Sequence, residues 1–254
     1  MSQSVARALS LLDRVAGGTS TLGELAEAEG VHKSTVLRLL RVLEDEGFVL
    51  HDGEHQYRLG PHLFRLAHQA LDSFEVRVVA APRLKSLRDE TAQTVHLAVL
   101  DGATAIYVDK LEPREMPVRM ASRIGKTADL HSTAVGKVLL TGLDPAERDE
   151  LIDQLTYVKY TENTPAGPAE LRDEIARTAE RGWSEDHAEN ETFINCVGAP
   201  IRGANGRILA AVSISVPDVL LPYEDVLELV PALLSATTDI SRDCGHRSTG
   251  HSPR

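Results

Sequence analysis

A ten-residue run that begins at Lys33 combines basic and hydroxyl side chains and contains no carboxylate, in a chain whose formal net charge is −11. Such side chains suit nucleic acids, because guanidinium and ammonium groups neutralise phosphates, while hydroxyl and guanidinium groups also hydrogen-bond to base edges. If the run is a helix, Ser34, Thr35 and Arg38 can contact bases, and Lys33 and Arg41 can contact phosphates. The alternative is a solvated, charged helix face without a partner.

Three further side chains could form a hydrolase site. Cys196, His131 and Asp186 would then act as nucleophile, base and orienting acid. Cys196 lies at the start of a predicted strand, however, and no helix N-terminus follows it. We therefore expect no catalytic residue and no enzymatic activity, and we keep a Cys-dependent hydrolase as an alternative.

The ten histidines raise the question of a metal site. His51 and His55 are separated by a predicted turn and do not share a helix face, while Cys244 and His246 lie in a tail without predicted structure. Neither pair has the spacing of a metal site, so we expect no metal and no cofactor. A metal-sensing protein of the same architecture stays as an alternative.

Length and composition exclude other classes. A chain of 254 residues favours a small domain and a larger one over a single core. Hydrophobic residues make up 42%, yet no apolar run approaches the roughly 18 to 20 residues of a membrane span. Two cysteines without a nearby partner predict reduced thiols, and the first residues lack the pattern of a signal peptide. We expect a cytoplasmic protein without a membrane partner.

The basic run lies in the second helix of a predicted helix-turn-helix at residues 22–40. Ala26 is small enough for two helices to approach, and Gly30 allows the tight turn between them. Val36 and Leu39 recur at helical spacing and face inward. The spacing therefore predicts that the basic run is the recognition helix of a DNA-binding unit.

A β-hairpin is predicted directly after this unit. Apolar runs at 48–50 and 57–59 flank a polar turn that contains Asp52. A helix-turn-helix followed by a hairpin is typical of a winged-helix domain. Arg58 on this wing and Arg7 on the first predicted helix are candidate contacts to the DNA backbone.

Beyond residue 93 the chain alternates between strand and helix patterns, which predicts a second, α/β domain after a pair of linker helices. Residues 209–216 place aliphatic side chains on one face and Ala211, Ser213 and Ser215 on the other. The second face is either the floor of a ligand pocket or an ordinary exposed strand face. Strands are predicted at 95–100, 106–110, 117–122, 183–186, 196–201 and 208–216, and helices at 134–141, 170–181 and 223–242.

Four motifs in this order resemble the IclR family of transcriptional regulators: RMASRIG at 119–125, HSTAVGK at 131–137, RGW at 181–183 and CVGAPI at 196–201. The resemblance covers about residues 4–243. It implies an α+β fold, in which a winged helix-turn-helix is joined by a linker helix to a GAF-like α/β effector-binding domain. The implied domains are a DNA-binding head at 1–62, linker and dimerisation helices at 63–92, the effector domain at 93–243 and a flexible tail at 244–254.

The same resemblance implies the ligand site. Ser132 and Thr133 are cap-type residues before a predicted helix, and free amides at a helix N-terminus attract carboxylates. In the family, this turn contacts small organic acids, through what would here be the amides of Ala134 and Val135. The other implied contacts are the polar side chains of Asp186, Cys196, Ser213 and Ser215 and the apolar side chains of Met120 and Ile194.

The residues also bear on the ligand. An ionised Asp186 would repel a carboxylate, so we expect it to face the far end of the ligand and to accept from a hydroxyl group. Residues 107–110, 120–125 and 132–137 are similar to regulators of 2-keto-3-deoxygluconate and related sugar acids. We therefore expect a repressor that binds double-stranded operator DNA as a homodimer or a dimer of dimers, controlled by a keto or hydroxy sugar acid. Sensing of an aromatic acid is the alternative.

Overall fold

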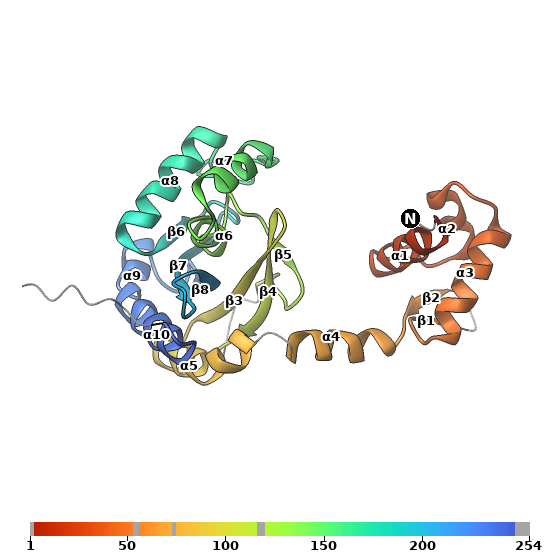
Figure 1. Cartoon of the computed structure of the whole chain (residues 1–254), viewed down its shortest axis with the longest axis horizontal. Helices are drawn as coiled ribbons and strands as arrows, with labels where there is room; N and C mark the ends of the chain where they lie inside the picture. The colour runs from red at the N-terminus through yellow and green to blue at the C-terminus, as the bar shows by residue number, and fades with distance from the viewer. Residues whose placement is uncertain (1–2, 53–55, 73–74, 116–119, 247–254) are drawn as a thin grey trace, which may run out of the picture. The chain divides into compact units, whose positions relative to one another are not determined.

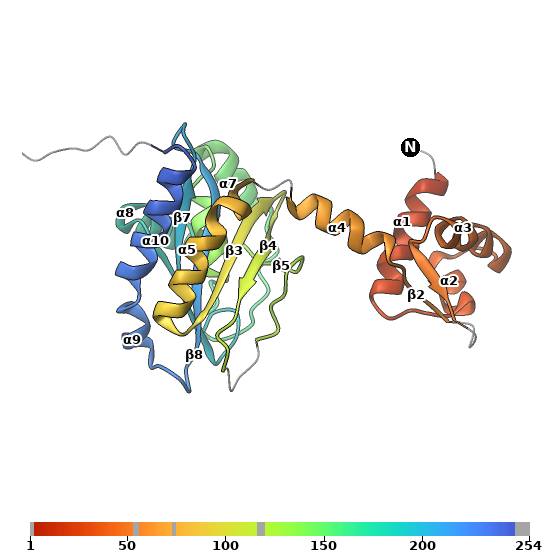
Figure 2. The same ribbon diagram turned by 90° about the horizontal axis from the view of Figure 1, so that it is seen from below.

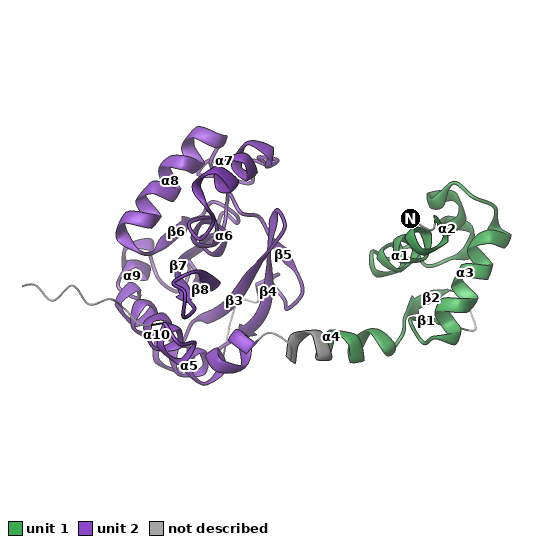
Figure 3. Ribbon diagram, in the orientation of Figure 1, with its two compact units in different colours: residues 1–73 green, residues 74–254 purple. Residues whose placement is uncertain are grey.

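The computed structural model describes residues 3–52, 56–72, 75–115 and 120–246, and for residues 68–72 it describes the backbone alone. The chain divides into two compact units, residues 1–73 and residues 74–254 (Figures 1 and 3). Each unit has its own hydrophobic core. Within the described ranges, no helix is long and apolar enough to cross a membrane.

The first unit is a winged helix-turn-helix, as predicted. Thr21 and Glu24 form a reciprocal capping box at the start of the second helix, and Gly30 ends that helix in the left-handed conformation with φ of 63°. Leu11, Leu25 and Leu40 are fully buried where the three helices meet. The elements are α1 (Gln3–Ala16), α2 (Leu22–Glu29), α3 (Lys33–Asp45), β1 (Val49–His51), β2 (Tyr57–Leu59) and α4 (His62–Asp72).

The wing is fastened to the loop that precedes α2. β1 and β2 pair antiparallel, and an isolated bridge joins Thr21 to Gln56. The Tyr57 amide donates to the Ser20 carbonyl over 2.7 Å, and the buried Tyr57 ring joins the core of the unit. The predicted turn at Asp52 continues into residues 53–55, which lie outside the described residues.

The second unit is built on an antiparallel sheet of six strands in the order β5-β4-β3-β8-β7-β6. Its strands are β3 (Thr94–Asp101), β4 (Thr104–Leu111), β5 (Thr127–Ala128), β6 (Ser184–His187), β7 (Ile194–Arg202) and β8 (Ile208–Pro217). Its helices are α5 (Glu75–Thr91), α6 (Ala134–Leu140), α7 (Pro145–Gln154), α8 (Pro168–Arg181), α9 (Tyr223–Leu227) and α10 (Val230–Asp243).

The helices cover both faces of this sheet. α5 and α10 pack against each other and against the strands (Figure 2). α6 packs against β7 and β8 on the other face, where its aliphatic residues share a core with Ala98 and Ala211. Strand β8 is buried on both faces from Ala210 onward. The sheet therefore separates two layers, and the Ser213 and Ser215 side chains face the layer that contains α6.

Three predictions for this unit were wrong or incomplete. Helix α7 was not predicted, although Asp144 and Pro145 are a typical helix start. The single helix predicted at 223–242 is two helices, because the second begins afresh with Pro231 in its first turn. Of the strand predicted at 117–122, residues 117–119 lie outside the described residues and the rest is not a strand. Tail residues 247–254 also lie outside the described residues.

Gly136 in α6 fixes how closely that helix approaches the preceding loop. A Cβ atom at this position would lie 2.5 Å from the Leu130 Cα and 2.7 Å from the Asp129 carbonyl oxygen. We expect Gly136→Ala to lower the free energy of unfolding by about 1 to 3 kcal/mol, because two backbone segments must separate. Urea unfolding measures this cost.

Gly167→Ala is the control. Nothing lies within 4 Å of a Cβ atom built at Gly167. Its cost should stay below about 1 kcal/mol, the size of a weakened N-cap. Equal losses of unfolding free energy in the two variants would show that the close backbone contact at Gly136 does not cause the destabilisation.

Candidate functional site

The first candidate site is the outward face of α3. Arg38 and Arg41 are exposed, and the inward Val36 and Leu40 of the same helix are fully buried. Lys33 and Ser34 are exposed at its first turn, Thr35 is partly exposed, and Arg58 is exposed on β2. The α3 residues predicted to contact DNA are thus accessible to a partner.

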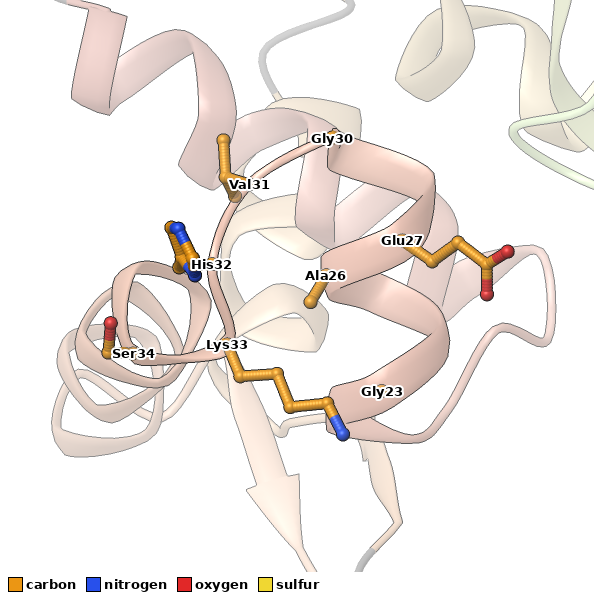
Figure 4. A pocket seen from close by; sticks show the side chains of 8 residues that line it. All are labelled: Gly23, Ala26, Glu27, Gly30, Val31, His32, Lys33 and Ser34. Atoms are coloured by element: carbon orange, nitrogen blue, oxygen red, sulfur yellow. The ribbon is translucent and has the colours of Figure 1, made fainter.

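An open groove of about 860 Å³ lies at the turn between α2 and α3 (Figure 4). The Lys33 side chain extends along α2 towards Gly23, and its Nζ would lie 3.7 Å from a Cβ atom on that glycine. Sequence reasoning missed the α2 contribution, although the absence of a side chain at Gly23 was a signal. The lining residues are Gly23, Ala26, Glu27, Gly30, Val31, His32, Lys33 and Ser34.

Arg7, the predicted contact on α1, is partly exposed and lies near a carboxylate that joins α1 to α2. Glu29 accepts hydrogen bonds from Ser10 and Arg14, each over 2.6 Å, and these bonds tie α1 to α2. The Ser10 and Arg14 contacts, with a smaller contribution from the Arg7 charge, lower the pKa of Glu29. Arg7 is near this carboxylate, and it stays a predicted contact to the DNA backbone.

The second candidate site is a cavity in the second unit, which we call the inner cavity; it encloses about 40 Å³. All of the residues predicted from the sequence to contact an effector line it: Met120, Ala134, Val135, Asp186, Ile194, Cys196, Ser213 and Ser215. Sequence reasoning missed the remaining lining residues, which are His96, Tyr107, Ser122, Thr133, Asn190 and Glu191.

His96, which sequence reasoning missed, connects Ser215 on β8 to Ser122 in the loop before β5. Its strand pairs with β8, so that His96 lies opposite Ser213. The His96 Nδ1 is 3.2 Å from the Ser215 Oγ, and its Nε2 is 2.8 Å from the Ser122 Oγ. The Cys196 Sγ donates to the same Ser215 Oγ over 3.1 Å. A hydrogen-bonded chain thus runs from Cys196 through two strands to the loop at Ser122.

His96 is neutral in this environment. Burial, and secondarily the nearby Lys110 charge, lowers its pKa to about 3. A neutral imidazole has one donor and one acceptor nitrogen, which matches its two serine hydroxyl partners. Lys110 on β4 is held by the loop that contains Ser122, because its Nζ donates to the carbonyl oxygens of Met120 and Ser122.

Asp186 is the buried carboxyl group of the inner cavity. Its Oδ1 accepts from the amide of Glu189 over 2.7 Å and from that of Asn190 over 3.4 Å. Burial raises its pKa to about 6, although the Lys137 charge and the two amides act in the opposite direction. The desolvation of the charged form therefore outweighs the hydrogen bonds that stabilise it.

A buried ion pair joins the two segments that flank this carboxyl group. The Lys137 ammonium, on the fully buried α6, lies 2.7 and 2.8 Å from the two carboxylate oxygens of Glu189. A carboxylate oxygen of Glu174 lies 3.9 Å from the same ammonium. Removing one partner of such a pair leaves a buried charge, so the pair fixes α6 relative to the loop that follows β6.

The inner cavity adjoins a larger opening of about 430 Å³, which we call the outer cavity. The two share Tyr107, Ser122, Asn190 and Glu191. Five further residues line the outer cavity and not the inner one: Lys126, Thr127, Ala128, Asp129 and Tyr160. The shared residues thus form a neck between the outer cavity and the buried polar groups.

The hydrolase alternative is not supported by this geometry. The His131 Nε2 lies 3.1 Å from the Val158 carbonyl oxygen, and His131 does not line the inner cavity with Cys196 and Asp186. Burial raises the pKa of Cys196 well above its usual value, which disfavours a nucleophilic thiolate. Among the described residues, no cluster of three or more His, Cys, Asp or Glu side chains could hold a metal ion.

Comparisons with known proteins agree with this architecture. The chain matches the IclR helix-turn-helix domain over residues 4–53 and the C-terminal domain of bacterial IclR transcriptional regulators over residues 68–242. It is 33% identical over 224 residues to the HTH-type transcriptional regulator KdgR of Dickeya chrysanthemi, covering 88% of this chain and 73% of the relative. A winged head joined to an α/β effector domain defines a DNA-binding transcriptional regulator, and the chain belongs to the IclR family.

Two further comparisons support the fold and the regulatory class. The chain is 31% identical over 244 residues to the transcriptional repressor IclR of Escherichia coli K12, covering 94% of this chain and 89% of the relative. The crystal structure of the Thermotoga maritima IclR matches with a TM-score of 0.79 and 32% identity, covering 97% of this chain and all of the other. These relatives are named as regulators, so the predicted class, a regulator and not an enzyme, is confirmed.

The neutral His96 makes a prediction for pH-dependent stability. Because its folded pKa of about 3 lies below the ordinary value of 6.5, the unfolded chain binds a proton between these values and the native protein does not. Its contribution to stability is therefore present above pH 6.5 and is lost as the pH falls. Between pH 7 and pH 5, urea unfolding should show a loss about 2 kcal/mol larger for the wild type than for His96→Asn. Parallel pH curves for the two proteins would contradict a neutral His96.

Proposed function

We propose that this protein is a repressor that binds operator DNA through α3 and whose binding is controlled by a keto or hydroxy sugar acid in the inner cavity. The observation that carries the effector site is the convergence of eight sequence-predicted residues, from five separate segments, on one cavity. In this proposal the protein acts as a homodimer or a dimer of dimers, because two heads are needed to bind the half-sites of a palindromic operator.

The DNA contact rests on the exposed side chains of α3. Ser34, Thr35 and Arg38 lie on the N-terminal part of the helix, which enters the major groove first in a helix-turn-helix. Lys33 and Arg41 flank them and supply charge to the phosphates. Residues 1–65 carry seven basic and nine acidic side chains, so binding depends on these focused contacts and not on a basic head.

The effector class rests on the chemistry of the inner cavity. The amides of Ala134 and Val135 at the start of α6 suit a carboxylate, and the serine hydroxyls of β8 suit hydroxyl or keto oxygens. The apolar wall is small, consisting of Met120, Ala134, Ile194 and Cys196. The similarity of residues 107–110, 120–125 and 132–137 to regulators of 2-keto-3-deoxygluconate supports a sugar acid over an aromatic acid, which stays as the alternative.

The size of the inner cavity suggests how a ligand acts on the domain. Its 40 Å³ holds a few water molecules, whereas ligand pockets usually measure about 300 to 1,000 Å³. A sugar acid must therefore move part of the lining, for example by opening the neck at Ser122 into the outer cavity. Such a ligand favours a different arrangement of the domain, which is what control of DNA binding requires.

The DNA contact is tested by Arg38→Ala. If Arg38 contacts a base, the variant should bind its operator more weakly by about 1 to 3 kcal/mol and lose discrimination at one base pair. Fragments selected from random DNA by the wild-type protein supply the operator, and fluorescence anisotropy measures affinity. Arg177→Ala, on the surface of α8 in the other unit, is the control and should bind like the wild type. Unchanged binding by Arg38→Ala would remove Arg38 from the interface.

The effector class is tested by calorimetric titration with a panel of sugar acids, pyruvate, glyoxylate and aromatic acids. We expect heat release with 2-keto-3-deoxygluconate or a related sugar acid, and a weakening of about tenfold or more in Ser213→Ala, which removes a hydroxyl from the cavity. Binding of aromatic acids alone would contradict the proposed class and favour the alternative.

A further inference from the structure

The charges around the inner cavity are unbalanced for an anionic ligand. Among the described residues that line it, Asp186 and Glu191 are acidic and none is a lysine or an arginine. Asp186 is 3% exposed, so water screens its charge poorly. An organic acid that enters this cavity as an anion would therefore add a second negative charge beside a buried carboxylate.

Neither of the two cations near the lining is free to compensate this charge. The Lys110 ammonium is paired with the Glu112 carboxylate over 2.8 Å. The Lys137 ammonium is already bound by both carboxylate oxygens of Glu189, and a carboxylate of Glu174 lies within 4 Å. One buried ammonium thus faces the carboxyl groups of Glu189, Glu174 and Asp186 before any ligand arrives. Like charges this close in a buried site favour the protonation of one carboxyl group.

We infer that Asp186 takes up a proton when the inner cavity binds an organic acid and then donates a hydrogen bond from its Oδ2 to an oxygen atom of the ligand. The inference deepens the proposed function and rests on it. The proton comes from solvent, so the ligand anion and the proton enter together and the charge of the site does not change. Asp186 is then a donor that selects a carboxylate or keto oxygen, rather than the ionised acceptor at the far end of the ligand that the sequence suggested.

The geometry identifies which oxygen carries the proton. The Asp186 Oδ1 already accepts from two backbone amides, those of Glu189 and Asn190. Protonation of Oδ1 would oppose these bonds, because an amide hydrogen and a hydroxyl hydrogen would compete for the same lone pairs. Oδ2 is therefore the oxygen that can hold the proton, and the two amides fix its orientation relative to the cavity.

The other titratable groups around Asp186 are less well placed to donate a proton to a ligand in the inner cavity. Burial raises the pKa of Glu189 to about 7 against the opposing Lys137 charge, but Glu189 does not line the inner cavity, and both of its carboxylate oxygens are bonded to Lys137. Glu191 is partly exposed and also lines the outer cavity, where water reaches it. Cys196 on β7 and Tyr107 on β4 stay protonated because burial raises the pKa of each. His96 on β3 stays neutral, so Asp186 is the buried carboxyl group of the lining that can take up the proton and donate it to a ligand.

The test is calorimetric titration of the full chain with 2-keto-3-deoxygluconate between pH 5.5 and 8.5, in pairs of buffers with different ionisation heats. This ligand stays ionised throughout, so a buffer-dependent heat reports protons taken up by the protein. With a pKa of about 6 in the free protein, the uptake should approach one proton per site at pH 8. The dissociation constant should rise about tenfold between pH 7 and pH 8 and level off below pH 6.

Two variants identify the side chain that takes up the proton. In Asp186→Asn, the side-chain oxygen can still accept from the amides and the NH₂ group replaces the protonated oxygen as donor. This variant should bind with no proton uptake and with the same affinity at every pH. Glu191→Gln is the matched control: it removes the other carboxylate of the lining, and its proton uptake should persist. Thermal unfolding of both variants without ligand checks that they fold.

The outcomes separate the two proposals. Binding of the sugar acid without proton uptake overturns the role of Asp186 and leaves the proposed effector class intact. Uptake that persists in Asp186→Asn assigns the proton to another group, Glu191 where Glu191→Gln abolishes it and Glu189 otherwise, and also overturns the role of Asp186. Absence of binding at every pH contradicts the effector class itself, and the inference about Asp186 is then rejected with it.

Discussion

The packing of the second unit depends on one buried charge, the ammonium group of Lys137. α6 is covered along its whole length, and Lys137 in its middle would be unstable there without a carboxylate partner. Glu189 supplies both of its carboxylate oxygens to this ammonium. The loop after β6 is consequently held against α6, and the amides of Glu189 and Asn190 are held at the Asp186 carboxyl group. The start of α6 and the carboxyl group of the inner cavity are therefore positioned by one buried interaction.

The antiparallel register of the sheet supplies the rest of the inner cavity. β8 lies between β3 and β7, so that Ser215 has Cys196 as its register partner on one side and Thr94 on the other. The period of two along each strand then directs His96, Cys196 and Ser215 to the same face. Small hydroxyl and thiol side chains on adjacent strands leave space under α6, where aliphatic residues would have filled it.

The two units place different demands on their residues. In the head, buried aliphatic residues determine the fold, and the exposed face of α3 is free to carry the residues predicted to contact DNA. In the effector domain, the functional groups are buried, so each must find a hydrogen-bond partner inside the protein. This difference explains why the exposure of the α3 face could be predicted residue by residue, whereas the pattern of β8 left a pocket floor and an exposed strand as equal alternatives.

The sequence by itself predicted most elements of the fold and eight of the residues that line the inner cavity, but not α7, β5 or His96. Helical periodicity, the Thr21–Glu24 capping box and Gly30 were enough for the winged helix, because these signals are local. The family motifs named the residues that line the inner cavity, but they could not show that Asp186 is buried among carboxyl groups or that His96 joins two serines. Only the tertiary structure decided these properties, because burial, register and the distance between charges depend on segments far apart in the chain.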